Sequence, residues 1–245
     1  MSDVIRIAHR GASGLGHAPE NTLAAFQLAI DIGVDGVECD VHCTKDGHVV
    51  VIHDHALDRT TDSKGSLDKL TLDEVKKADA GSWFDPRFSG ERIPTLREVL
   101  KLTKGKALTV VEIKQTGIAN KVIREIEEAK AVDEVVLISF HASALQDAKK
   151  INPRIPRAFL LGGRKLIGKR SAIMDIVQQA AELGSALDLG SKIISPNLIR
   201  EAHLRGIGVW AWTVDDEPEM RKLAEMGVDA ITSNYPDRLN SVFAE

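Results

Sequence analysis

The sequence predicts an α/β protein, because short runs rich in β-branched residues alternate with longer amphipathic segments along most of its 245 residues. A second observation is the position of glycine: Gly33, Gly184, Gly206 and Gly227 stand where the amphipathic segments should end as helices. Such regular alternation is typical of a parallel sheet whose strands are joined by helices. A third observation, the number of strands, points to a barrel.

The expected strands and helices alternate along the chain. The strands are expected at residues 4–8, 36–44, 48–53, 108–113, 135–140, 157–161, 186–189, 208–214 and 229–233. The helices are expected at residues 21–32, 95–104, 118–131, 143–151, 171–183, 196–205 and 218–226. Asn21 and Thr95 precede apolar-periodic stretches and are expected to cap the first two helices.

The second and third expected strands must form a hairpin, because the connection between them is too short for a parallel crossover. A two-residue Asp46-Gly47 turn would pair Asp40 with His53, whereas a register shifted by one residue would move His53 to the other face. The hairpin extends the second strand, so eight strands remain. Eight is the number that closes a TIM (β/α)8 barrel, and we expect residues 1–245 to form one such domain.

Residues 54–94 fit no strand–helix unit. The stretch is rich in Asp, Gly, Thr and Pro, and it contains one short amphipathic segment at residues 70–77 and an aromatic pair, Trp83-Phe84. We interpret it as a small inserted cap segment after the hairpin, packed over one end of the barrel as a lid. We expect no separate hydrophobic core in it.

The composition is that of an ordinary globular protein, with 43% hydrophobic and 28% charged residues. A formal net charge of −4 argues against a general nucleic-acid binder, which usually carries a basic face. An anionic substrate would therefore need local positive charge, which a bound divalent cation, Arg10 and Lys114 could supply. The basic cluster within residues 164–170 is interpreted as a solvated loop.

The two cysteines indicate a reducing compartment. Cys39 and Cys43 would lie roughly 13 Å apart along one extended strand, which is beyond disulfide reach. Free thiols favour the cytoplasm. We also expect no signal peptide and no stable membrane insertion, because no suitable apolar segment stands at the start of the chain or within it. The oligomeric state is not predicted.

Three carboxylates form a candidate metal site. Glu38 and Asp40 are two residues apart in one expected strand, so both point to the same face, and Glu112 lies near the end of another strand. Oxygen-rich sites suit Mg²⁺ or Ca²⁺. A solvent-facing acidic pair is the alternative, but the strand around Glu38 and Asp40 is otherwise apolar, and buried charges need partners.

Two histidines and two cations complete the candidate site. His9 and His53 follow strand-like runs, and histidine titrates near neutrality, which suits a general acid and a general base. Arg10 and Lys114 are the expected phosphate contacts. Of the remaining histidines, His17, His48 and His203 are expected at the surface, His42 beyond the site, and His55 and His141 in loops that could contribute to it.

These motifs, in this order, resemble the glycerophosphodiester phosphodiesterase family over essentially the whole chain. The matching motifs are His9-Arg10-Gly11, Pro19-Glu20-Asn21-Thr22, Glu38-x-Asp40, Thr44-Lys45-Asp46-Gly47, His53-Asp54, Arg59-Thr60-Thr61, Ile93-Pro94-Thr95-Leu96, Glu112-Ile113-Lys114, Ser139-Phe140, Trp212-Thr213-Val214 and Asn234-Tyr235-Pro236-Asp237. Two departures are minor: Asp215 replaces the more frequent Asn, and the last strand reads Ile231-Thr232-Ser233.

The resemblance implies a TIM barrel with an inserted cap and assigns roles to the matching positions. Glu38, Asp40 and Glu112 would hold a divalent metal, and His9 and His53 would be catalytic. Arg10 and Lys114 would lie near the phosphate, Phe140 and Trp212 would wall the glycerol side, and Glu20 would support the site.

The predicted function is metal-dependent hydrolysis of glycerophosphodiesters, such as glycerophosphocholine or glycerophosphoethanolamine, to sn-glycerol 3-phosphate and an alcohol. The nucleophile is either water or the 2-hydroxyl of the substrate. One alternative is a lysophospholipase D-like or another metal-dependent barrel hydrolase, such as an amidohydrolase, suggested by His53-Asp54-His55. A second alternative is a non-catalytic phosphodiester-binding barrel, although a pure binder has no need of two proton carriers.

Overall fold

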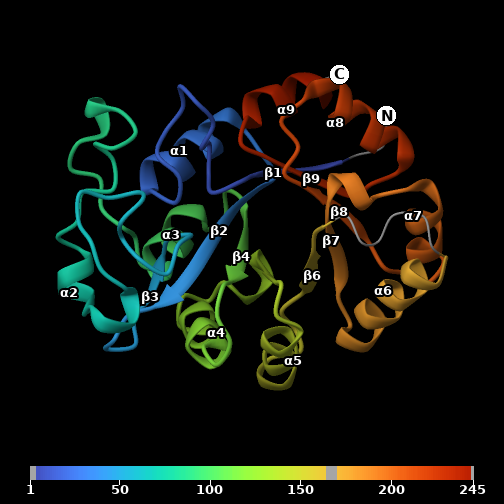
Figure 1. Cartoon of the computed structure of the whole chain (residues 1–245), viewed down its shortest axis with the longest axis horizontal. Helices are drawn as coiled ribbons and strands as arrows, with labels where there is room; N and C mark the ends of the chain where they lie inside the picture. The colour runs from blue at the N-terminus through green and yellow to red at the C-terminus, as the bar shows by residue number, and fades with distance from the viewer. Residues whose placement is uncertain (1–3, 164–169, 244–245) are drawn as a thin grey trace.

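The computed structural model describes residues 4–163 and 170–243. A nine-stranded sheet lies at its centre, in the order β1-β9-β8-β7-β6-β5-β4-β2-β3, and β1 also pairs with β2. This last pairing closes eight parallel strands into a barrel, and helices surround it (Figure 1). The predicted TIM barrel is confirmed. Of the expected basic loop, residues 164–169 lie outside the described residues.

All nine expected strands are present within a few residues of their expected bounds. They are β1 (Ile5–Ala8), β2 (Gly36–Cys43), β3 (Val49–Val51), β4 (Leu108–Ile113), β5 (Val135–Ser139), β6 (Arg157–Leu161), β7 (Ala186–Gly190), β8 (Val209–Trp212) and β9 (Ala230–Ser233). The helices are α1 (Leu23–Ile32), α2 (Leu72–Val75), α3 (Leu96–Thr103), α4 (Ala119–Glu128), α5 (Ala142–Ile151), α6 (Arg170–Leu183), α7 (Pro196–His203), α8 (Glu217–Met226) and α9 (Pro236–Phe243). The sequence reading missed α9.

Side chains alternate between the two faces of each barrel strand. Cys39 and Val41 of β2 point outward into the apolar layer shared with the helices. Inward-pointing side chains, including Val110 and Leu160, fill the barrel interior. Glu38 and Asp40 take the inward positions of β2, as their parity predicts, and both are buried. The interior is therefore a packed apolar plug with charged groups at one end.

The predicted hairpin is present, but its predicted register is wrong by one residue. In the β2–β3 pair, Val41 lies opposite Val51, and the Ile52 amide donates to the Asp40 carbonyl at 3.0 Å. Ile52, rather than His53, is thus the partner of Asp40. The strand ends at Val51, so strand parity does not govern where the His53 side chain points.

Turn geometry explains the difference in register. The Thr44 amide donates to the His48 carbonyl at 3.0 Å, so three residues, not two, lie within the turn. The Thr44 hydroxyl donates to Asp46 Oδ1 at 2.6 Å and accepts from the His48 amide at 3.0 Å. Gly47 closes the turn with φ of +89°, a conformation that favours glycine. The Thr44 side chain therefore selects the longer turn.

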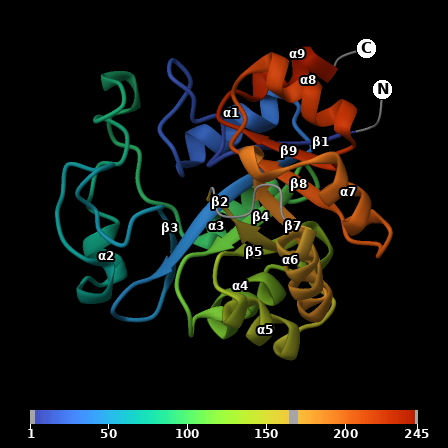
Figure 2. The same cartoon turned by 45° about the vertical axis from the view of Figure 1, so that its right-hand side comes forward.

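The insertion at residues 54–94 lies to one side of the barrel, beyond the β2–β3 hairpin, in both views (Figures 1 and 2). Its apolar residues Leu57, Leu67 and Val75 pack together with Val50 and Ile52 of the hairpin region, so the insertion shares its apolar cluster with the barrel. The insertion therefore shields the apolar residues of the hairpin region from solvent.

The insertion starts and finishes at neighbouring points. Val50 forms an isolated antiparallel bridge with Thr95, and the Val51 amide donates to the Pro94 carbonyl at 2.8 Å. Thr95 then caps α3 as predicted, through a capping box with Glu98. The chain therefore returns to the barrel beside the place where it left.

No helix within the described ranges, residues 4–163 and 170–243, combines the length and the apolar composition that a membrane crossing requires.

Candidate active site

A pocket at the carboxyl ends of the barrel strands brings most of the predicted residues together. Its lining consists of His9, Arg10, Glu38, His53, Glu112, Lys114, Ile138, Phe140, Leu160, Asp188, Trp212 and Thr232. Of the other predicted residues, Asp40 is fully buried beneath the lining, and Glu20 contacts Arg10 from behind. This end of the barrel is where TIM-barrel enzymes place their active sites.

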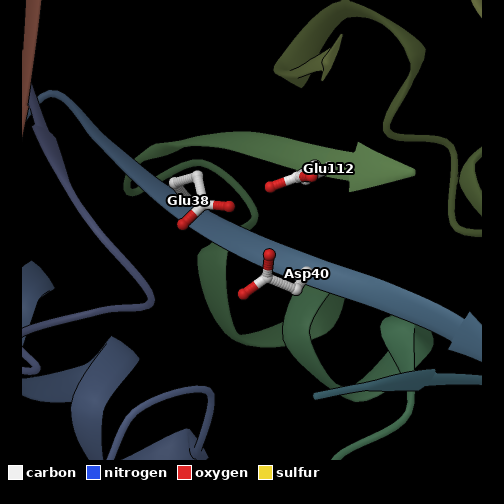
Figure 3. Close-up of side chains that lie close together, drawn as sticks. All are labelled: Glu38, Asp40 and Glu112. Carbon is white, nitrogen blue, oxygen red and sulfur yellow. The ribbon is translucent and has the colours of Figure 1, made fainter. Parts of the chain in front are cut away.

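The three carboxylates converge as predicted. Asp40 of β2 lies directly opposite Glu112 of β4 in the parallel register, and Glu38 is two residues before Asp40 on the same face. All three side chains are buried, with one ligand atom from each within 4.8 Å of the others, and they turn toward one another (Figure 3). Glu38 Oε1 and Asp40 Oδ1 are buried and have no hydrogen-bond partner among residues 4–163 and 170–243.

The electrostatics of this cluster favour a bound cation. Burial, reinforced by the neighbouring carboxylates, raises the pKa of Glu38 well above its ordinary value and that of Glu112 to about 7. Burial would also raise the pKa of Asp40, but Arg10 and Lys114 overcome that effect, and the pKa lies below its ordinary value. Crowded carboxylate oxygens, two of which have no hydrogen-bond partner among the described residues, fit a divalent cation, which would relieve the repulsion.

Arg10 is held by a tight turn after β1. Its amide donates to Glu38 Oε2 at 2.9 Å, its Nη1 donates to Glu20 Oε1 at 2.9 Å, and its Nε lies 3.1 Å from Asp40 Oδ2. Arg10 has φ of +56°, in the left-handed region, and Gly11 follows at +80°. A Cβ on Gly11 would lie 2.6 Å from the Ala25 carbonyl carbon, so only glycine fits.

Lys114 shares its end of β4 with Glu112, as predicted. Its Nζ lies 3.0 Å from Glu112 Oε1 and 3.3 Å from Asp40 Oδ1. Burial lowers the pKa of Lys114, but the Asp40 and Glu112 carboxylates outweigh burial and raise it. The pocket therefore holds two fixed positive charges, Arg10 and Lys114, beside its carboxylates.

His53 is oriented by an ion-pair network that reaches into the insertion. Its Nδ1 lies 2.6 Å from Asp54 Oδ1, and Arg59 donates to Asp54 from Nε at 2.9 Å and Nη2 at 3.1 Å. Arg59 also binds both oxygens of Glu20, at 2.8 and 2.9 Å. Glu20 in turn holds Arg10, so it supports the site from behind, as the resemblance implies.

His42 has a closer connection to the site than expected. It is buried, its Nε2 lies 3.0 Å from the His53 carbonyl, and its Nδ1 lies 3.2 Å from Gln115 Oε1. Its position on the inward face of β2 places it next to the segment that carries His53. The two loop candidates, His55 and His141, are exposed and do not line the pocket.

His9 is partnered by an amide instead of a carboxylate. Its Nδ1 lies 2.7 Å from Asn234 Oδ1, and its Nε2 lies 4.0 Å from Glu38 Oε2. Burial, followed by the nearby Arg10 charge, lowers the pKa of His9 to about 4. The ring is therefore neutral at pH 7. Asn234 belongs to a motif used for the family resemblance, but its role was not predicted.

The apolar side of the pocket is formed by Phe140 and Trp212. Their rings meet edge to face, with centroids 5.4 Å apart and an interplanar angle of 87°. Trp212 Nε1 donates to the Asp188 carbonyl at 3.1 Å. Phe140 is 43% exposed, so this wall reaches the pocket mouth.

Asp188 is a pocket residue that the sequence reading missed. Its side chain is buried, and its Oδ1 has no hydrogen-bond partner in the part of the chain that the structure describes. Burial, with a contribution from Glu112, raises the pKa of Asp188 to about 8. The signal was present, because Asp188 interrupts an apolar strand in the same way as Glu38 and Asp40 do.

Asn21 supports the site and is not the helix cap that its position predicts. Thr22 caps α1 through its hydroxyl, and Asn21 has φ of +57°. Asn21 Nδ2 donates to Asp40 Oδ2 at 2.8 Å, and its Oδ1 accepts from the Asp40 amide at 3.2 Å. Asn and Thr are both common N-cap residues, and only the tertiary contact of Asn21 with Asp40 distinguishes the roles of Asn21 and Thr22.

Comparison with known proteins identifies the family. The model of the Glycerophosphoryl diester phosphodiesterase family matches residues 9–238 of the chain. The chain belongs to the glycerophosphoryl diester phosphodiesterase family. The resemblance predicted from the motifs is thereby confirmed, and the expected enzyme class is that of the family. The matched region begins at His9 and therefore includes every predicted site residue.

Members of the glycerophosphoryl diester phosphodiesterase family are similar to this chain over nearly their whole length. The glycerophosphodiester phosphodiesterase of Caldanaerobacter subterraneus subsp. tengcongensis is 38% identical over 240 residues, which cover 95% of each protein. The glycerophosphodiester phosphodiesterase of Bacillus subtilis is 31% identical over 98% of this chain and 86% of its own length.

Among solved structures, an Oleispira antarctica phosphodiesterase in complex with the product sn-glycerol-3-phosphate has a TM-score of 0.86 and 32% identity. The match covers 98% of this chain and 96% of that one.

Proposed function

We propose that this protein hydrolyses glycerophosphodiesters, such as glycerophosphocholine or glycerophosphoethanolamine, to sn-glycerol 3-phosphate and an alcohol. The observation that carries the proposal is the presence of two differently partnered histidines, His9 and His53, in one pocket with a carboxylate cluster and two cations. The product bound to the Oleispira antarctica relative supports the choice of substrate class.

In this proposal, Glu38, Asp40 and Glu112 hold one divalent cation, Mg²⁺ or Ca²⁺. When bound, the cation would neutralise charge that builds on the phosphoryl oxygens during the reaction. Arg10 and Lys114 would hold the other side of the phosphate, since both line the pocket and carry fixed positive charge.

His9 is the candidate general base. It is half-buried, neutral and paired with an amide, so it can accept a proton from the attacking hydroxyl, whether that belongs to water or to the substrate's own 2-hydroxyl. His53 is the candidate general acid, because it lines the pocket and the Asp54 carboxylate at 2.6 Å from its Nδ1 orients its ring. It would protonate the departing alcohol.

Phe140 and Trp212 would wall the glycerol side of the substrate. Their edge-to-face pair presents an apolar surface at the pocket mouth, against which the carbon atoms of glycerol can pack. We also propose that the protein works on this small substrate in the cytoplasm, since both cysteines are buried free thiols.

The test is release of glycerol 3-phosphate from glycerophosphocholine with Mg²⁺, with Ca²⁺ and with EDTA. We expect product with a metal and none with EDTA, and His9→Ala should abolish turnover while the circular dichroism spectrum stays unchanged. Accumulation of a cyclic phosphate would identify the 2-hydroxyl as nucleophile. Absence of product under every metal condition would rule out the substrate class.

A further inference from the structure

A chain of hydrogen bonds runs from Asp215 to His9 at the carboxyl end of β9. We propose that Asp215, acting through Asn234, fixes the tautomer of His9, so that Nδ1 carries the proton and Nε2 presents a lone pair to the pocket. The effect of this tautomer on catalysis rests on the proposed function, but the assignment of the tautomer does not depend on that function. Asp215 is thus a positioning residue that acts through Asn234.

The Asp215 carboxylate determines which way the Asn234 amide points. Asp215 Oδ1 accepts from the backbone N–H of Asn234 at 2.9 Å and from the Ser233 hydroxyl at 3.0 Å. Asp215 Oδ2 accepts from Asn234 Nδ2 at 2.7 Å. Because a carboxylate can only accept, the side-chain atom of Asn234 that faces it must be the NH₂ group. The opposite orientation would set two oxygens against each other.

The Asn234 oxygen then determines where the His9 proton lies. With its NH₂ group turned to Asp215, Asn234 presents Oδ1 to His9 Nδ1 at 2.7 Å and to the Ser13 hydroxyl at 3.1 Å. Ser13 also donates to the His9 carbonyl at 2.7 Å, so its hydroxyl does not replace the histidine as donor. An amide oxygen is an acceptor, and His9 Nδ1 must therefore carry the hydrogen.

The consequence falls on the other ring nitrogen. In a neutral imidazole only one nitrogen bears hydrogen, so His9 Nε2 keeps a free lone pair. Nε2 is the nitrogen on the side of Glu38, whose Oε2 lies 4.0 Å away, and His9 lines the pocket. The relay therefore prepares His9 to accept a proton from a group bound in the pocket.

The substitution Asp215→Asn should reverse the tautomer. The variant keeps the shape of the side chain but places an NH₂ group where Asp215 Oδ2 accepts from Asn234. Two donors would then face each other, and rotation of the Asn234 amide by a half turn would relieve this contact. The rotated amide would point its NH₂ group at His9 Nδ1, which would become the acceptor, and the proton would move to Nε2.

The experiment measures ¹⁵N chemical shifts of the His9 ring in full-length protein labelled with ¹⁵N-histidine, in Mg²⁺ buffer without substrate. The signals are assigned by their loss in His9→Ala. We expect a protonated Nδ1 in the wild type and a protonated Nε2 in Asp215→Asn. The matched control is Asp216→Asn, because Asp216 is the exposed neighbour that caps α8 and Asn caps equally well. In Asp216→Asn, the tautomer of His9 and the activity of the enzyme should be unchanged.

Kinetics with glycerophosphocholine give a second measurement. We expect kcat of Asp215→Asn to fall on the order of 100-fold with little change in KM, as for loss of a general base. If Asp215→Asn does not fold, Asn234→Ala replaces it in the experiment. This variant removes the side chain that joins Asp215 to His9, and we expect both tautomers of the His9 ring in it. A wild-type His9 ring protonated at Nε2 would overturn the proposal. So would a His9 tautomer that stays unchanged in Asp215→Asn, or in Asn234→Ala where that variant is used. An inactive wild type with the expected shifts would overturn only the proposed function.

Discussion

Two carboxylates of this site, Asp40 and Glu112, are buried in contact with groups of opposite sign. Asp40, the most buried, lies 3.1 Å from Arg10 Nε and 3.3 Å from Lys114 Nζ. Removing one partner of a buried pair typically costs about 3–5 kcal/mol, because the other charge is left uncompensated. Within the described residues, Glu38, Asp40 and Asp188 each keep one side-chain oxygen without a hydrogen-bond partner.

Asp188 gives a prediction for the pH dependence of stability. Its pKa rises from 3.8 in the unfolded chain to about 8 in the folded one, because it is buried and lies near Glu112. The stability that the protonated form contributes is complete below about pH 4 and is lost as the pH rises toward 8. Asp188→Asn, which is uncharged at all pH values, should therefore gain stability relative to the wild type over this window.

The measurement is urea denaturation of both proteins in EDTA at pH 5, 6.5 and 8. The difference in unfolding free energy should grow in favour of the variant by at most about 1.4 kcal/mol per pH unit. A difference that stays constant over the window would contradict the assigned environment of Asp188.

Single residues were predictable where a charge interrupts an apolar strand. Glu38, Asp40 and Glu112 converge because strand parity and parallel register leave them no other arrangement. The relay to His9 was not predictable in the same way. Asp215 and Asn234 follow the neighbouring strands β8 and β9, and the side-chain geometry beyond the strand ends, which brings Asp215 Oδ2 to 2.7 Å from Asn234 Nδ2, is not given by strand parity.

At the scale of elements, the turn between β1 and α1 places Arg10 and depends on Gly11. Gly11→Ala should destabilise the protein by about 2 kcal/mol or more, because it adds a contact of 2.6 Å with Ala25 to an unfavourable φ. Chemical denaturation checks this. Gly16→Ala is the control, since Gly16 has φ of +88° but no described residue lies within 4 Å of a new Cβ. Equal losses in the two variants would argue against the close approach.

Arg59 connects the insertion to both sides of the site. Arg59→Met should lower kcat for glycerophosphocholine about 10- to 100-fold, because Asp54 would no longer be held against His53. Stability should change little, since the Arg59 side chain is 43% exposed. Arg87→Met is the matched control: Arg87 binds the carbonyls of Gly16 and His17 but not Asp54. A similar loss of kcat in both variants would contradict the role of Arg59.

Elements with clear periodicity were predicted to within a few residues. The helix α9 was missed because its Pro236 start lay within a motif noted for another reason. The hairpin register depended on one hydroxyl, that of Thr44, which a count of turn residues does not include.

At the scale of the whole molecule, the closed barrel collects carboxylates that the fold alone does not neutralise. Addition of Mg²⁺ or Ca²⁺ should therefore stabilise the protein, by about 2.7 kcal/mol at a concentration 100 times Kd. Thermal denaturation with each metal and with EDTA measures the effect. Glu112→Gln should remove most of it, whereas Asp188→Asn, which replaces a pocket carboxyl outside the proposed ligand set, should keep it. Equal metal responses in the two variants would contradict the assigned ligands.

The barrel as a whole was predictable, because the number of strands and the handedness of strand–helix–strand connections allow few topologies. Eight parallel strands joined by helices close in one way, and the ninth, β3, could only pair antiparallel with β2. The packing of residues 54–94 was not predictable, since its apolar side chains are spaced irregularly and join a cluster begun by the hairpin.

The bridge between Val50 and Thr95 has a consequence for the history of this protein. A segment whose two ends already touch can lengthen, shorten or be exchanged with little entropic cost to the framework that carries it. The framework would keep the chemistry, while successive replacements at this one junction could admit new substrates. A chimera that carries a relative's insertion between these two residues should fold, and its choice of alcohol would show what the exchanged segment controls.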